Sequence, residues 1–227
     1  MVFQRLIQAI VFVAALWVPL AASSVTVPFT EGFASDVANW TDNEGNPLTF
    51  NSAGGPDGGS YASSEFNYYE YFSPFGGGPV VLRASGLSNA SGGAFIGNWS
   101  ASGVTEVTAK VRHNSPVDLN FYMRVAASPS NYPGAIYPSM MSVAPNTWTD
   151  LSYSIAGVCI DEGVPCASVL ANVGNLQFGT DAPAALLDDD VVYSIDIDLV
   201  SIVPEPGTAS LMFMGFMGLA KFGRPRR

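Results

Sequence analysis

Four side chains that could bind a polysaccharide alternate along two neighbouring segments of the chain. Lys110 and Arg112 lie in the first segment, and Tyr122 and Arg124 lie in the second. If the two segments pair as an antiparallel hairpin, all four side chains project from one face of a sheet. Guanidinium groups form paired hydrogen bonds, and phenol rings stack on other flat surfaces. This set, called the polar platform below, predicts affinity for an acidic or neutral polysaccharide. An ordinary solvated sheet face is the alternative.

Carboxylates form a second group of residues whose side chains could bind a ligand. Three consecutive acidic residues, Asp188–Asp190, precede the last predicted strand, and Asp196 and Asp198 lie two residues apart within it. Residues two apart in a strand point to the same face of the sheet. Hard oxygen ligands of this kind suit calcium, although the EF-hand pattern is absent. A solvated acidic turn and strand face is the alternative interpretation.

Catalytic motifs are missing from the sequence. His113 is the only histidine, so a Ser-His-Asp triad would have to use it, yet no G-x-S-x-G motif is present. One histidine does not supply an H-E-x-x-H zinc site, and the glycine-rich stretches lack the lysine of a phosphate-binding loop. A pair of carboxylates for glycoside cleavage stays open, because their separation in space is not visible in a sequence. We therefore predict that the protein is not an enzyme.

Two cysteines, Cys159 and Cys166, bracket a short loop. In an oxidising compartment we expect them to form a disulfide. Closing so short a loop stabilises the fold by about 2–3 kcal/mol. A metal-binding pair or a redox couple is the alternative, but the spacing is not C-x-x-C and no histidine is near.

Short strands are the elements that would position these residues. Apolar and polar residues alternate through much of the chain, and Gly, Pro, Asn and Ser fill the intervals. The longer predicted strands are Val104–Arg112, Asp118–Ala126, Thr147–Ile155 and Tyr193–Val203, and the shorter ones are Val80–Ser85, Gly93–Asn98, Met140–Ala144 and Leu176–Gly179. In the last long strand, the inward residues are predicted to be Ile195, Ile197, Leu199 and Val203. Many short strands at regular spacing predict an all-β fold, an antiparallel β-sandwich.

Three stretches resemble a jelly roll of the galactose-binding-like type, as found in carbohydrate-binding modules and laminin-type B domains. They are Glu31-Gly32-Phe33 followed by Asn39-Trp40, the glycine-rich loop 54–61, and Ile197–Ile202. The resemblance implies that the first and last strands lie close together and that a structural calcium ion joins that region. The calcium ligands it implies are Glu31, Asp57 and Asp198, and no other cofactor is expected.

The charge of the central region restricts its partners. Between residues 25 and 203 there are four basic residues, Arg83, Lys110, Arg112 and Arg124. The same region holds 18 acidic residues, because Glu205 is the only one of the chain's 19 that lies outside it. A net charge near −14 disfavours binding to nucleic acid or to an anionic membrane surface.

The C-terminal residues resemble the PEP-CTERM sorting signal of bacterial surface proteins. Pro204, Glu205 and Pro206 are followed by the apolar stretch Leu211–Ala220 and then by the basic residues Lys221, Arg224, Arg226 and Arg227. The apolar stretch is short for a spanning helix, which needs about 20 residues. The resemblance implies temporary anchoring and cleavage by an exosortase-type membrane protease. A permanent anchor, or a tail packed on the domain, is the alternative.

The N-terminal residues have the pattern of a secretory signal peptide. Arg5 precedes the apolar stretch Leu6–Leu20, and the small residues Ala21–Ser24 suit signal peptidase. An uncleaved N-terminal anchor is the alternative. We therefore predict a signal peptide helix at 1–24, a β-sandwich at 25–203, and a sorting signal with a short hydrophobic helix at 204–227.

These features together predict a destination. The protein is expected to be exported, held briefly in the inner membrane of a Gram-negative bacterium, and then placed at the cell surface or outside the cell. The sorting-signal family is associated with exopolysaccharide and biofilm, which implies a non-enzymatic surface or matrix protein. The alternatives are a dedicated carbohydrate-binding module and a secreted polysaccharide-active enzyme.

Overall fold

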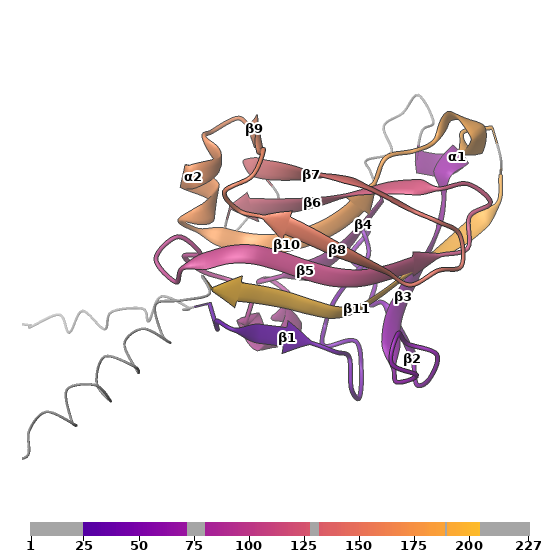
Figure 1. Ribbon diagram of the computed structural model, residues 1–227, viewed down its shortest axis with the longest axis horizontal. Helices are drawn as coiled ribbons and strands as arrows, with labels where there is room; N and C mark the ends of the chain where they lie inside the picture. Colours follow the sequence, from indigo (N-terminus) through magenta and orange to yellow (C-terminus); the bar gives the residue numbers. More distant parts are fainter. Residues whose placement is uncertain (1–24, 72–79, 128–131, 189, 205–227) are drawn as a thin grey trace, which may run out of the picture.

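The computed structural model describes residues 25–71, 80–127, 132–188 and 190–204 (Figure 1). The predicted signal peptide lies outside the described residues. The sorting signal does too, apart from Pro204, which ends the last strand. Within the described ranges, no helix is both long enough and apolar enough to cross a bilayer.

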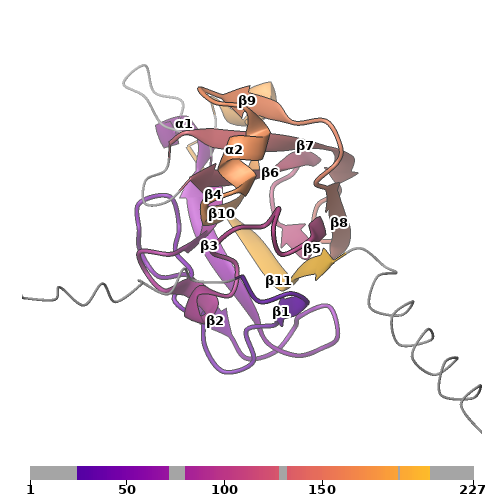
Figure 2. The ribbon, with the colours of Figure 1, turned by 90° about the vertical axis from the view of Figure 1, so that its left-hand side faces the viewer.

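Two antiparallel sheets form the molecule, which confirms the predicted β-sandwich (Figure 2). Sheet A has the order β2-β3-β11-β5-β8, and β1 also pairs with β11. Its strands are β1 (Phe29–Glu31), β2 (Thr49–Asn51), β3 (Tyr61–Asn67), β5 (Val104–His113), β8 (Thr149–Ser154) and β11 (Val192–Pro204). Sheet B has the order β4-β10-β6-β7-β9. Its strands are β4 (Val80–Ser85), β6 (Leu119–Ala127), β7 (Gly134–Val143), β9 (Ile160–Glu162) and β10 (Val173–Thr180).

The predicted hairpin of the two central strands is wrong. β5 pairs with β11 and β8, whereas β6 pairs with β10 and β7, so the chain crosses from sheet A to sheet B between them. Both strands alternate, and their apolar faces are buried within the sandwich. Alternation shows which face of a strand is buried, but it does not tell a neighbour in the same sheet from a strand in the opposite sheet.

The crossing between β5 and β6 is fixed by local hydrogen bonds. Oγ of Ser115 bonds Nδ1 of His113 at 2.8 Å and donates to the carbonyl of Val117 at 2.8 Å. Nε2 of His113 bonds the carbonyl of Val143 on β7 at 2.8 Å. These bonds satisfy buried polar groups where the chain leaves one sheet and enters the other.

Aromatic side chains fill the core between the sheets. Trp40 lies edge-on to Phe33 and Phe95, with ring centroids 5.5 and 5.7 Å apart. Trp40 and Trp99 are fully buried. Trp148 differs, because its ring lies against the guanidinium of Arg112 on the outer face of sheet A.

A β-bulge in β11 reverses the inward pattern of the last strand. Ile195 and Ile197 are buried as predicted, but the register shifts between Asp198 and Ser201. Leu199 adopts a left-handed conformation with φ 48°. Beyond the bulge the buried residues are Val200 and Ile202, so the inward prediction for Leu199 and Val203 is wrong. One extra residue moves every later side chain to the other face.

The shorter elements were predicted with mixed success. Cys159 and Cys166 form the predicted disulfide, which joins the residue before β9 to the first residue of α2 (Cys166–Leu170). The segment Gly93–Asn98 is not a strand, because a 3₁₀ turn occupies Ala90–Gly93 and tight turns follow. The resemblance to a jelly roll correctly implied that the first and last strands are adjacent, since β1 pairs with β11.

Candidate functional site

The polar platform is divided between the two outer faces of the sandwich. Tyr122 and Arg124 lie on β6 in sheet B, and Lys110 and Arg112 lie on β5 in sheet A. The four side chains therefore do not form one surface. Each half has other polar neighbours, and each is described separately below.

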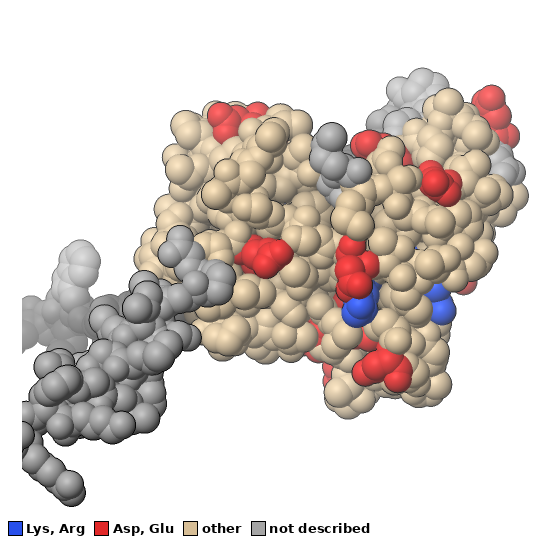
Figure 3. Space-filling model, in the orientation of Figure 1, with Lys and Arg blue, Asp and Glu red and all other residues tan. Residues whose placement is uncertain are grey.

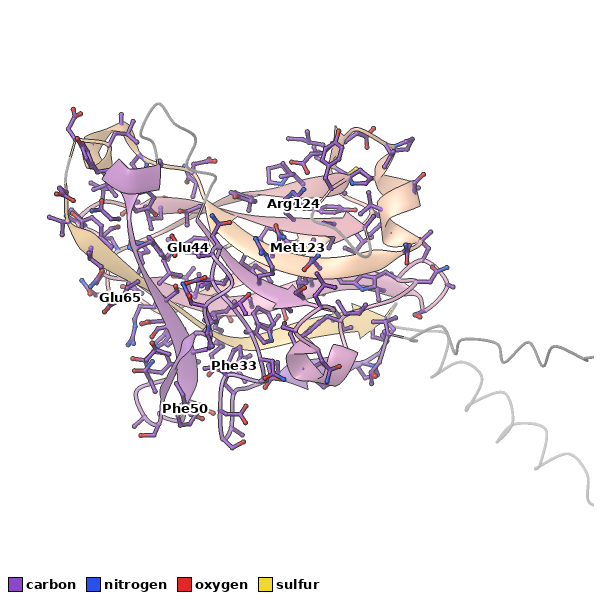
Figure 4. All side chains as sticks on the ribbon, turned by 180° about the vertical axis from the view of Figure 1, so that it is seen from behind. Phe33, Glu44, Phe50, Glu65, Met123 and Arg124 are labelled. Carbon is purple, nitrogen blue, oxygen red and sulfur yellow. A yellow bond between two sulfur atoms is a disulfide. The ribbon has the colours of Figure 1, made fainter. Side chains whose placement is uncertain are left out.

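On sheet B, a row of polar side chains crosses three strands. Arg83 on β4, Gln177 on β10 and Arg124 on β6 occupy matching register positions. Arg124 donates from Nη1 to Oε1 of Gln177 at 3.0 Å and from Nε to Oε2 of Glu162 at 2.7 Å. We call Arg83, Gln177, Arg124 and Tyr122 the sheet B row. Figure 4 labels Arg124 beside Met123, whose side chain enters the core instead.

A glycine makes room for the ion pair in this row. Gly134 on β7 lies opposite Glu162 on β9. A Cβ atom on Gly134 would overlap the carboxylate of Glu162 and would lie 2.5 Å from Nη2 of Arg124. The ion pair therefore lies directly across the glycine, and only a residue without a side chain leaves this position open.

Two polar atoms of the sheet B row are buried without a hydrogen-bond partner. They are Oη of Tyr122 and Nε of Arg83. Burial raises the pKa of the Tyr122 phenol, so the hydroxyl keeps its proton and remains a donor. Burial, followed by the nearby charge of Arg124, lowers the pKa of Arg83. An unpaired buried polar group costs about 1–3 kcal/mol, so each such atom in a native structure calls for an explanation.

On sheet A, a groove of about 380 Å³ lies over β2, β3, β11 and β5. Arg112 and Asp196 face each other across β5 and β11, with Nε and Nη2 of the guanidinium both 2.7 Å from Oδ2 of the carboxylate. The guanidinium also lies over the rings of Tyr61 and Trp148, at 5.1 and 4.7 Å from their centroids. Lys110 stays apart from this group, because it pairs with the exposed Asp150.

The three carboxylates implied as calcium ligands come from separate parts of the chain. Glu31 ends β1, Asp57 lies in the loop between β2 and β3, and Asp198 lies at the bulge of β11. Asp198 is 1% exposed. Its pKa is raised to about 6, first by burial and then by the negative charges of Asp57 and Glu31. A buried carboxylate that is repelled by two others fits a site for a hard cation.

Backbone oxygens add to this carboxylate group. A Cβ atom on Gly55 would lie 2.9 Å from the carbonyl oxygen of Ser60, 3.0 Å from that of Gly59 and 3.2 Å from Oδ2 of Asp198. A cation bound between these groups would neutralise the carboxylates and tie β1 and the loop to β11. The oxygens of Glu31, Asp57 and Asp198 do not all lie within 4.8 Å of one another in the described chain.

A tighter group of ligand atoms is not suited to a metal. Within the described residues, Cys159, Asp161 and Cys166 have ligand atoms within 4.8 Å of one another. Both sulfur atoms are joined in the disulfide. Oδ1 of Asp161 accepts the backbone N–H of Cys166 at 2.7 Å. This group is therefore structural.

His113, the only histidine, is held in a structural position. It is 1% exposed, and both ring nitrogens are hydrogen-bonded, to Ser115 and to Val143. Burial lowers the pKa of the imidazole. A general base has to reach the proton that it removes, so His113 in this position does not serve a triad.

Several site residues were missed by sequence reasoning. Arg83 was counted as one of four basic residues but was not assigned to a site, although it alternates with Leu82 and Ala84, which face the core. Asp196 is predicted with Asp198 as a carboxylate suited to calcium or as part of an acidic face, and its pairing with Arg112 is not visible without the β5–β11 register. Gln177 carries no charge signal and was found only from the strand pairing.

No family model matches the chain, and no curated protein matches it. Among solved structures it is similar to a CBM22 xylan-binding domain from Paenibacillus barcinonensis, with 11% identity, a TM-score of 0.45, and coverage of 82% of this chain and 100% of that chain. It is also similar to the family 11 carbohydrate-binding module of a Clostridium thermocellum cellulase, with 11% identity, a TM-score of 0.46, and coverage of 80% and 97%.

A third similarity is to the CBM22-1 and GH10 modules of a Clostridium thermocellum endo-1,4-beta-D-xylanase. It has 14% identity and a TM-score of 0.47 over 79% of this chain. The chain spans only 28% of the length of that xylanase chain. The assignment as a β-sandwich rests on the strand pairing of this molecule.

Proposed function

We propose that the chain is an exported, non-enzymatic protein whose β-sandwich binds a polysaccharide at the sheet B row. The observation that carries this proposal is the pair of buried atoms without partners, Oη of Tyr122 and Nε of Arg83. Sugar hydroxyls both donate and accept hydrogen bonds, so hydroxyls that reach these two donors on binding would satisfy them. Bound water would satisfy the same two atoms without a ligand, and the binding measurement below separates these outcomes.

The neighbouring groups are already held in place. Arg124 is fixed by Glu162 and Gln177, and its side chain is only 13% exposed. A guanidinium held in one geometry loses little side-chain entropy when a ligand binds. The sheet B row therefore has the preorganisation expected of a binding surface.

The charge of the row also favours a ligand rich in oxygen. Arg83 and Arg124 are two of the four basic residues between 25 and 203, and Arg124 lies close enough to disfavour the charge of Arg83. Oxygen atoms of a neutral or acidic polysaccharide would relieve this repulsion. Nucleic acid remains an unsuitable partner by our proposal, because the whole chain carries a net charge of −10.

Targeting completes the proposal. The N-terminal residues support processing by signal peptidase, and the Pro204–Arg227 pattern supports brief anchoring and cleavage by an exosortase-type protease. The destination is the cell surface or an exopolysaccharide matrix. The intact mass of protein recovered from surface and membrane fractions tests this part. A mass that retains Leu211–Arg227 in the membrane fraction would require a permanent anchor instead.

A matched pair of variants tests the binding surface. Tyr122→Phe removes only the hydroxyl, and we expect binding on an array of neutral and acidic oligosaccharides to weaken by about tenfold. Tyr137→Phe is the control, because its hydroxyl is also buried without a partner but its ring faces the core. Tyr122→Ala combined with Arg124→Ala should abolish binding of the acidic oligosaccharides. Wild-type retention of glycans by the double variant would mean that the sheet B row is not the site.

A further inference from the structure

The groove on the outer face of sheet A has no part in the site proposed above. It lies on the opposite side of the sandwich from the sheet B row, and Figure 4 labels residues of both, Glu65 on β3 and Arg124 on β6. Its volume is about 380 Å³. We propose that this groove is a second, separate binding site, and that its ligand is a neutral saccharide.

Hydrogen-bonding groups of both kinds line the groove. Of the two carboxylate oxygens of Asp196, only Oδ2 accepts hydrogen bonds from the guanidinium of Arg112. Oδ1 therefore keeps its lone pairs for another donor. Asp196 is 6% exposed, so its carboxylate is a fixed part of the floor. The carboxylate of Glu65 has no hydrogen-bond or ion-pair partner among the described residues. Asn51 donates to Oγ of Ser63 at 2.9 Å, which leaves the amide oxygen of Asn51 and the hydroxyl hydrogen of Ser63 for a ligand.

A sugar ring presents neighbouring hydroxyls that donate and accept in alternation. Two carboxylates that accept, an amide that does both and hydroxyls that do both match this pattern better than they match an apolar or a purely cationic ligand. The groove is therefore chemically suited to a polyhydroxylated molecule.

An aromatic wall, made of Tyr61 and Trp148, borders the groove on the side of Tyr61. Tyr61 lines the groove, and its ring lies edge-on to Trp148 with centroids 5.5 Å apart. Nε1 of Trp148 and Nη1 of Arg112 both donate to the carbonyl of Gly54, at 3.1 and 3.4 Å. These bonds fix the wall before any ligand arrives. The carbon-bound hydrogens of a sugar pack favourably on a fixed aromatic surface.

The charge of the groove restricts the saccharide to a neutral one. Glu65 and Asp196 carry two negative charges, and Arg112 is the one cation in the lining. A carboxylate or sulfate on the sugar would meet a net negative surface on a chain that is itself strongly acidic. In Figure 3, acidic side chains are scattered over the visible face and basic ones are few. The sheet B row, with an arginine on either side of Gln177, has the opposite preference.

Two sites on opposite faces would let one domain connect two polysaccharide chains. This consequence rests on the proposed function of the sheet B row, whereas the groove itself does not. The test uses the full chain on an array of neutral and acidic oligosaccharides. Glu65→Gln keeps the size of the side chain, and its carboxylate has no described partner to lose. We expect this variant to bind neutral oligosaccharides about tenfold more weakly than the wild type.

Asp196→Asn is the second groove variant, with its fold checked by thermal unfolding. Asp150→Asn is the matched control, because Asp150 is an exposed carboxylate of the same sheet outside the groove. If the wild type binds no neutral oligosaccharide, or if Glu65→Gln binds as the wild type does, the groove proposal is overturned. Loss of binding in the groove variants alone supports the groove and contradicts the sheet B row. Loss of binding in the Tyr122 and Arg124 variants alone supports the sheet B row and contradicts the groove.

Discussion

The two outer faces of the sandwich use the same pair of chemical groups in different surroundings. On sheet B, Arg124 pairs with Glu162 inside a row that also contains a second arginine. On sheet A, Arg112 pairs with Asp196 beside an open groove and lies over two aromatic rings. An arginine–carboxylate pair therefore does not define a function by itself. The neighbouring groups decide whether the surface is positive and enclosed or negative and open.

The support for each arginine also differs. Arg124 depends on a glycine that leaves space, whereas Arg112 depends on aromatic rings that fill space. An atom added at the glycine would disturb Arg124, whereas atoms lost from the aromatic rings or from the guanidinium would disturb Arg112. Substitutions should therefore affect the two faces in different ways and by different amounts.

The largest effect is expected from Gly134→Ala. The new Cβ atom would overlap Glu162 and press on Arg124, so the ion pair would have to separate in a partly buried place. We expect the free energy of unfolding to fall by about 3 kcal/mol, measured by urea denaturation. Gly32→Ala is the control, because its nearest neighbour to a new Cβ atom would be 3.6 Å away. Equal stability of the two variants would contradict this account of sheet B.

The next largest effect concerns Asp198, beneath the loop at one end of sheet A. The folded pKa of about 6 lies above the ordinary 3.8, so the folded state holds this proton more tightly than the unfolded state does. This contribution to stability is greatest below pH 4 and is lost as the pH rises to about 6. The difference amounts to at most roughly 3 kcal/mol. Asp198→Asn should remove this fall, so the variant should gain on the wild type between pH 4 and 6 in the presence of EDTA.

Calcium should stabilise the wild type more than it stabilises Asp198→Asn. A bound cation stabilises the ionised carboxylates, so calcium at pH 7 should raise the unfolding temperature of the wild type more than that of Asp198→Asn. The histidine titrates with the opposite sign, because burial lowers the pKa of His113. The comparison is therefore made between variant and wild type at each pH. If calcium leaves both melting temperatures unchanged, Glu31, Asp57 and Asp198 do not form a calcium site.

A smaller effect is expected from Arg112→Lys. Lysine keeps the charge opposite Asp196 but loses the flat guanidinium that lies over Tyr61 and Trp148. We expect a loss of about 1 kcal/mol in the free energy of unfolding, and a fall in Trp148 packing visible by near-ultraviolet circular dichroism. An unchanged spectrum would show that the aromatic wall stands without the arginine.

The sequence allowed the fold class, the disulfide and the four longer predicted strands to be predicted, because alternation and loop chemistry are local signals. It did not allow the sheet partners to be predicted. β5 and β6 both alternate, and nothing in their residues distinguishes pairing in one sheet from packing across the core. The polar platform was therefore placed on one face, while the structure divides it between two.

The bulge at Leu199 shows a second limit. The pattern of β11 could be extended correctly only as far as Ile197, because a single left-handed residue then shifts the register. Leucine is not a residue that signals a positive φ, so the sequence gives no warning there. The same bulge places Asp198 against the loop from Asn51 to Ser60, so the local departure from alternation coincides with the carboxylate group.

The smallest effect is expected from Lys110→Met, and it separates the third basic residue from the two arginine pairs. Lys110 bonds Asp150, whose side chain is 78% exposed, so water screens this pair strongly. Asp150 also lies outside the groove. We expect a change in the free energy of unfolding of less than about 0.5 kcal/mol and no change in glycan binding. A loss as large as that of Arg112→Lys would mean that the charge of β5 matters more than its contact with the aromatic rings. The contrast between the two faces would then have to be explained by net charge alone.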